Sequence, residues 1–155
     1  MDLLKYTLRI ADSSIILGQR LSSWCSKGPT LEEDIALSNL SLDLFGQANA
    51  LLEYASKLDG TKSADDFAFK RNEREFYNLQ LTEQLNGHFG DTIVRHFLFS
   101  VYSFLFYSKL SNSKDETLAA IAAKSLKEIK YHLTHSKSWV IRLGDGTEKS
   151  NKKIQ

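Results

Sequence analysis

The stretch TLEEDIALSNLSLDLFGQANALLEYASKLDG, residues 30–60, decides the fold. Thr30 followed three residues later by Glu33 is a capping-box pattern, in which hydroxyl and carboxylate satisfy backbone N–H groups at a helix start. Apolar residues then recur at helical spacing on one face, and Asp59-Gly60 ends the pattern. The residues on that face are Leu37, Leu44, Ala48, Leu51, Ala55 and Leu58. The stretch therefore predicts one long helix with a buried face.

The rest of the chain has the same helical character. It contains 23 leucines and 11 alanines against 3 valines, and its only proline is Pro29. Apolar periodicity predicts further long helices over residues 2–24, 89–111 and 115–144. Residues 61–84 carry a weaker pattern, for which we expect a short helix capped by Asp65 or Asp66 and irregular chain. The predicted fold class is an all-α, antiparallel four-helix bundle.

Length and composition fit one globular domain, which we expect to cover residues 1–155. The net charge of +1 and the lack of a basic stripe with interleaved aromatics disfavour nucleic-acid binding. The longest apolar stretch, Phe97 to Tyr107, falls short of the ~20 residues that span a bilayer. With Cys25 alone and no leader pattern, we expect a cytoplasmic protein without a membrane segment. A helix starting near Thr147 has few residues left, so we expect the domain's C-terminal helices to be missing.

A bundle of long helices raises the question of a carboxylate-bridged di-iron site. Such a site uses Glu-x-x-His pairs, because residues three apart project to one face of a helix and supply oxygen and nitrogen ligands. None of the nine glutamates is followed by histidine at that spacing. The remnants are Asp43 with Gly46 and Glu128 with Tyr131. We expect no metal site, catalytic residue or cofactor site in this chain.

Two histidines lie close to the second remnant. His132 and His135 form a His-x-x-His pair, but without clear inward carboxylates they give an incomplete metal site, and we expect structural roles. His88 and His96 stand beside no recognisable nucleophile motif, which disfavours a hydrolase triad.

The predicted helix 89–111 is dense in aromatic residues. They are Phe97, Phe99, Tyr102, Phe104, Phe106 and Tyr107. Such a set can line an aromatic pocket, form the protein's own core or face another subunit. We favour a subunit interface, with Phe97, Phe99, Tyr102 and Phe106 as candidates.

Several separate segments resemble one known family. Gly18-Gln19-Arg20-Leu21-Ser22 with Trp24, the run Leu31 to Leu37, and Leu42 to Ala48 are similar to PaaC-type structural subunits of ring-1,2-phenylacetyl-CoA epoxidase. The later segments Arg71 to Asn78, Phe97-Leu98-Phe99, Lys127-Glu128 with Tyr131-His132, and Arg142 to Glu148 follow in the same order. The resemblance runs from about Leu3 to the last residue.

The resemblance implies a ferritin-like bundle that pairs with a homologous catalytic subunit in phenylacetate catabolism. That partner would hold the di-iron centre and epoxidise phenylacetyl-CoA with O2, and a reductase with flavin and iron–sulfur groups would deliver electrons from NADPH. This chain would be the non-catalytic scaffold, in which Asp43 with Gly46 and Glu128 with Tyr131 occupy two former ligand pairs. Two alternatives stay open: a dimetal oxidase or oxygenase with the unusual ligands Asp43, Glu128 and His132, or a helical interaction module unrelated to oxygenation.

Overall fold

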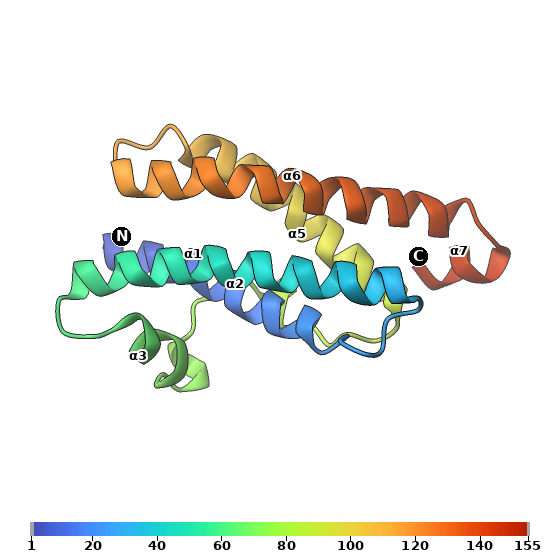
Figure 1. The fold of residues 1–155 in the computed structure, drawn as a ribbon, viewed down its shortest axis with the longest axis horizontal. Helices are drawn as coiled ribbons and strands as arrows, with labels where there is room; N and C mark the ends of the chain where they lie inside the picture. The colour runs from blue at the N-terminus through green and yellow to red at the C-terminus, as the bar shows by residue number, and fades with distance from the viewer. Residues whose placement is uncertain (1, 155) are drawn as a thin grey trace. The chain divides into compact units, whose positions relative to one another are not determined.

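The computed structural model describes residues 2–154, which form seven α-helices and one short 3-10 helix and contain no strand (Figure 1). The predicted all-α class is confirmed. The chain separates into two compact units divided between Gln84 and Leu85, and each unit is described by itself. The expectation of a single domain over residues 1–155 stays a prediction.

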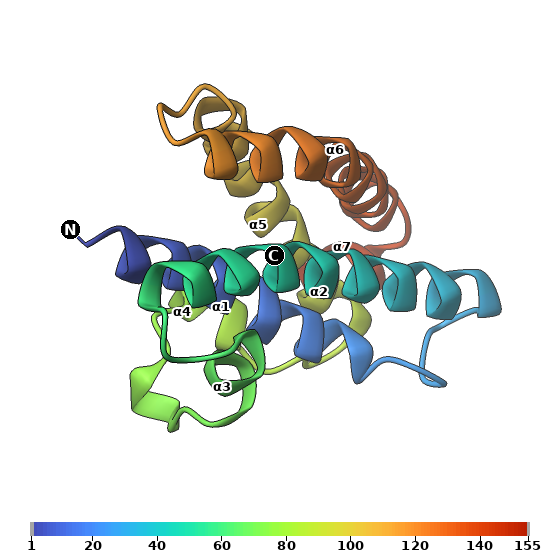
Figure 2. The same ribbon diagram turned by 60° about the vertical axis from the view of Figure 1, so that its left-hand side comes forward.

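Two long helices form the body of unit 1. Helices α1 (Leu3–Ser22) and α2 (Leu31–Asp59) run antiparallel along each other (Figures 1 and 2). As predicted, the Thr30 hydroxyl accepts a hydrogen bond from the Glu33 amide, and Gly60 ends α2 with a left-handed φ of 76°. Only Leu58 departs from the predicted buried face, because it lies in the last turn of α2 and is exposed.

The core of unit 1 consists mainly of leucines. The least exposed are Leu17, Leu21, Leu37, Leu40, Leu44 and Leu51, each at most 1% exposed. Burying such a side chain is worth about 1.5–3 kcal/mol, so this face provides most of the drive for pairing α1 with α2.

The segment that follows α2 holds α3 (Ala64–Phe69), the 3-10 turn η1 (Glu73–Glu75) and α4 (Gln80–Glu83). The expected short helix is present, but the prediction that Asp65 or Asp66 caps it is wrong. Ser63 is the N-cap, accepting a bond from the Asp66 amide at 3.1 Å, while the Asp66 carboxylate accepts the Ser63 amide at 2.8 Å. The reciprocal pair satisfies two backbone donors at once, which a lone aspartate cap does not.

Unit 2 is built on α5 (Phe89–Leu110) and α6 (Glu116–Gly144), which run antiparallel, followed by α7 (Glu148–Ile154). The predicted bounds of both long helices are confirmed to within one residue. Asp115 caps α6 through the Leu118 amide. Helix α7 packs against both α5 and α6, and the Asn151 side-chain amide donates to the Gly144 carbonyl at 2.8 Å.

Candidate functional site

The first remnant of a metal-ligand pair lies on α2 in unit 1. Asp43 is half-buried, whereas Gly46 is exposed. A Cβ added at Gly46 would have no described atom within 4 Å. Glycine carries no donor atom on a side chain, so this pair supplies at most one carboxylate to a metal.

The second remnant lies on α6 in unit 2. Glu128 and His135 are half-buried, His132 is only 2% exposed and Tyr131 is 52% exposed. The Tyr131 and His135 rings lie 6.1 Å apart between centroids. Among residues 2–154, no three or more His, Cys, Asp or Glu side chains are grouped so that they could hold a metal ion. The donor set of these residues does not fit a di-iron centre.

A buried histidine pair stands at the centre of unit 2. The rings of His96 on α5 and His132 on α6 lie 5.2 Å apart between centroids. Both ring nitrogens of His96 are buried without a hydrogen-bond partner in the described chain. Burial lowers the pKa of His96 well below its usual value, and the charges of His132, His135 and Arg95 lower this pKa further. His96 is therefore a neutral packing group at pH 7.

Unit 1 has its own polar centre, the buried ion pair between Arg71 and Asp12, which we call the brace. The Arg71 guanidinium forms two bonds with the Asp12 carboxylate, one of them 3.0 Å long, and the two side chains are 7% and 0% exposed. The Tyr77 amide donates to the same carboxylate at 2.9 Å, and Arg71 Nε donates to the Phe67 carbonyl at 2.6 Å. The guanidinium carbon also lies 4.1 Å from the centre of the Phe76 ring.

The brace was not predicted from the sequence, although one signal for it was present. Asp12 sits among the apolar residues of α1, and a carboxylate on a buried helix face needs a cationic partner. The partner, Arg71, lies 59 residues away in the segment with the weakest pattern. A single sequence gives no means of choosing it from 20 lysines and arginines.

The aromatic residues of α5 divide into buried and outward groups. Phe99 is 5% exposed, Phe97 and Phe106 are half-buried, and Tyr102 is 44% exposed with its ring stacked on Phe106. The interface role assigned to them stays a prediction.

The outward surface of α5 also contains aliphatic residues. Leu98 and Leu105 are 49% and 60% exposed, and with Tyr102 they follow the spacing of one helix face. We call Leu98, Tyr102 and Leu105 the α5 stripe. Its two leucines were not predicted from the sequence, because the interface candidates on this helix were aromatic residues alone.

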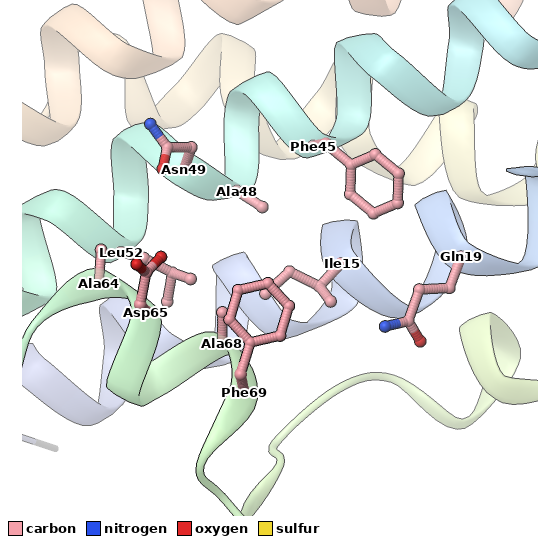
Figure 3. A pocket seen from close by; sticks show the side chains of 10 residues that line it. All are labelled: Ile15, Gln19, Phe45, Ala48, Asn49, Leu52, Ala64, Asp65, Ala68 and Phe69. Atoms are coloured by element: carbon pink, nitrogen blue, oxygen red, sulfur yellow. The ribbon is translucent and has the colours of Figure 1, made fainter.

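Unit 1 also contains a surface hollow of about 390 Å3 between α1, α2 and α3, within the size range of ligand pockets (Figure 3). Phe69 of α3 stands at the rim, 79% exposed, and Ala48 and Asn49 of α2 lie across from it. The lining residues are Ile15, Gln19, Phe45, Ala48, Asn49, Leu52, Ala64, Asp65, Ala68 and Phe69. No lining side chain is cationic, so the hollow offers no counter-charge for a phosphate-bearing ligand.

The sequence matches a family model described as "Phenylacetic acid catabolic protein" over residues 1–155. The chain belongs to this family. It is also 48% identical over 154 residues to a protein of Escherichia coli strain K12 that is named as a subunit of 1,2-phenylacetyl-CoA epoxidase. That alignment covers 99% of this chain and 62% of the curated relative, so the chain spans less than two thirds of that protein's length.

Membership of the family confirms two predictions: the resemblance to the epoxidase structural subunits and the ferritin-like helical fold. In residues 2–154, no helix combines the length and the apolar character needed to cross a membrane. A cytoplasmic location stays a prediction. The placing of Asp43 with Gly46 and of Glu128 with Tyr131 at former ligand positions also stays a prediction.

Proposed function

We propose that this chain is a non-catalytic structural subunit of a phenylacetyl-CoA epoxidase in phenylacetate catabolism. The observation that carries the proposal is 48% identity, over nearly the whole chain, to a protein named as a subunit of that enzyme. The missing Glu-x-x-His pairs support the non-catalytic role, and so does the poor fit of the described donor set to a di-iron centre.

In this proposal the chemistry belongs to other components of the complex. A homologous catalytic subunit holds the di-iron centre, and a reductase with flavin and iron–sulfur groups passes electrons from NADPH. The present chain binds the catalytic subunit and limits the motion of its helices. A supporting element of this kind keeps the reactive groups of a site within the narrow geometry that catalysis needs.

The α5 stripe is the surface that we assign to the catalytic subunit. Its three side chains are each 44–60% exposed, and they share one face of the helix that is richest in aromatic residues. Large apolar and aromatic side chains are the usual anchors of protein interfaces. Phe99 is too buried to contact a partner directly, and we expect it to pack beneath the α5 stripe, inside unit 2.

A binding measurement with the purified di-iron subunit tests this surface. Changing Tyr102→Glu or Leu105→Glu should weaken binding by roughly 30-fold or more, because each places a charge in an apolar contact. The matched control is Leu85→Glu, a leucine 81% exposed in the turn before α5, which should leave binding unchanged. Undiminished binding by both stripe variants, with normal circular dichroism, would reject the assignment.

The iron content of the isolated chain tests the non-catalytic role separately. After anaerobic incubation with ferrous iron and desalting, we expect less than about a tenth of an equivalent of iron, because the donor set is incomplete. Close to two irons per chain, lost on Glu128→Ala, would instead identify the chain as an oxidase or oxygenase.

A further inference from the structure

Unit 1 contains a second hollow, which is basic, unlike the one between α1, α2 and α3. It has a volume of about 300 Å3, and Lys5, Arg9, Tyr77 and Asn78 line it. This volume lies at the lower end of the range for ligand pockets. Lys5 and Arg9 are four residues apart on α1, so they lie one turn apart on the same face of the helix. We call these four residues the basic hollow.

Both cations of the basic hollow lack an anionic partner in the described chain. Within residues 2–154, Lys5 and Arg9 are exposed and form no ion pair. Asp12 follows Arg9 at the usual spacing of a helical ion pair, but its carboxylate is buried and bound to Arg71. Two like charges one turn apart repel each other and destabilise a helix. An anion bound between Lys5 and Arg9 would remove this repulsion.

The opposite wall of the basic hollow is fixed to α1 by hydrogen bonds. The Tyr77 amide donates to the buried Asp12 carboxylate at 2.9 Å. Two residues later, the Leu79 amide donates to Ser13 Oγ at 3.2 Å. These two bonds hold the chain on either side of Asn78. The wall is therefore in place before any ligand binds, which lowers the entropic cost of binding.

The Tyr77 side chain gives the basic hollow an aromatic surface and a further donor. Lys5 Nζ lies 4.8 Å from the centre of the Tyr77 ring, within the range of a cation–π contact. The residue is 39% exposed, and its hydroxyl forms no hydrogen bond within residues 2–154. Two cations and one hydroxyl therefore line the same hollow, and no carboxylate does.

We propose that the basic hollow binds a dianionic phosphate group, either inorganic phosphate or a phosphate monoester. The guanidinium of Arg9 matches phosphate because it donates two parallel bonds to two oxygens, and Lys5 supplies a second charge at one point. A single carboxylate would leave one of the two cations unpaired. The Tyr77 ring offers a flat surface to the organic part of a monoester.

Titration of the full chain with inorganic phosphate tests the site, with binding followed by calorimetry at about pH 8 and low salt. We expect a dissociation constant below about 5 mM, weakened at least 10-fold by Lys5→Gln and by Arg9→Gln, because each variant removes a charge-assisted bond. Circular dichroism checks that both variants fold. The matched control Lys127→Gln removes an exposed lysine from α6 and should leave the affinity unchanged.

Three outcomes would overturn the proposal. The first is a dissociation constant for phosphate above about 5 mM, and the second is unchanged affinity in both hollow variants. The third is an equal loss of affinity in Lys127→Gln, which would show a response to net charge alone. Succinate carries the same total charge on two separated groups and should bind at least 5-fold more weakly than phosphate. Equal binding of succinate would overturn the assignment to phosphate.

Adenosine 5′-monophosphate (AMP) distinguishes a monoester from free phosphate. Binding of AMP at least 5-fold tighter than that of phosphate, with the advantage lost in Tyr77→Leu, identifies a monoester whose ring packs on Tyr77. Equal or weaker binding of AMP identifies phosphate itself as the ligand. Both results support the basic hollow as a phosphate site.

These measurements are independent of the proposed function, because they are made without the di-iron subunit. Absence of phosphate binding overturns the assignment of the basic hollow and leaves the proposed structural role unchanged. Undiminished partner binding by the α5 stripe variants tests only the interface with that subunit.

Discussion

The two units differ in the contacts that supplement the apolar packing of their long helices. In unit 1 the segment 61–84 is tied to α1 by polar contacts: the brace, a bond from the Leu79 amide to Ser13 Oγ, and a bond from Arg20 to the Glu83 carbonyl. In unit 2 the described contacts between α5 and α6 include the His96–His132 ring pair and the edge-on Phe89–Trp139 pair.

This difference predicts which changes destabilise each unit. Unit 1 depends on a fully paired buried charge, and losing either partner leaves the other uncompensated. Within residues 2–154, both ring nitrogens of His96 and the Ser103 hydroxyl in unit 2 are buried without a hydrogen-bond partner. The stability of unit 2 therefore depends on keeping His96 neutral and both side chains packed. The chain's two tryptophans, Trp24 in unit 1 and Trp139 in unit 2, allow each unit to be followed by fluorescence.

The largest effect is expected from breaking the brace. Arg71→Met leaves the Asp12 carboxylate buried without a cation, and the free energy of unfolding of unit 1 should fall by about 3–5 kcal/mol. The measurement is urea unfolding followed by Trp24 fluorescence in a Trp139→Phe background.

Two further variants make this experiment specific. Arg74→Met, an exposed arginine in the same segment, should change stability by less than about 0.5 kcal/mol. Combining Arg71→Met with Asp12→Leu should restore most of the loss, because no buried charge remains. A loss below about 1 kcal/mol for Arg71→Met would contradict the prediction and show that the brace contributes little to the stability of unit 1.

Lowering the pH should lower the free energy of unfolding of unit 2, because His96 is buried in its neutral form. Because its folded pKa is lowered, mainly by burial, the unfolded chain takes up a proton near the ordinary histidine pKa of about 6.5 while the folded chain does not. Stability is then lost as the pH falls below about 6.5, by up to about 1.4 kcal/mol per pH unit for one proton.

Unfolding followed by Trp139 in a Trp24→Phe background, between pH 7.5 and 5, measures this slope. His96→Leu should reduce the slope of the free energy of unfolding against pH by the contribution of one proton. The control is His88→Asn, which keeps a helix-capping side chain before α5 and should retain the slope. An unchanged slope in the His96→Leu variant would contradict the prediction.

A pair of buried serines gives the smallest effect and the closest comparison between the units. Ser41 donates to the Gly18 carbonyl at 2.8 Å across unit 1, so Ser41→Ala should lower the free energy of unfolding by about 1 kcal/mol. Ser103 in unit 2 is buried and has no hydrogen-bond partner among the described residues, so Ser103→Ala should be neutral or stabilising. Thermal unfolding of both variants measures the difference, and equal losses would show that the two hydroxyls do not differ in this way.

The long helices were predictable because their signals are local. The Thr30 cap, the Gly60 stop and the apolar period of α2 all lie within one stretch of sequence. The segment 61–84 was not predictable in detail because Asp12 and Ser13, far away in the chain, fix its position. The outward direction of Leu98 and Leu105 depended on which face of α5 meets α6. Periodicity alone does not settle this when a helix is apolar almost all round.

The brace also has a consequence for the order in which the chain folds. Its ion pair joins residues 59 positions apart, whereas only five residues connect α5 to α6. Contacts between distant residues form late, because a long loop must first be closed at an entropic cost. The α5–α6 hairpin should therefore form early. The segment 61–84 should be the last part of unit 1 to reach its native conformation.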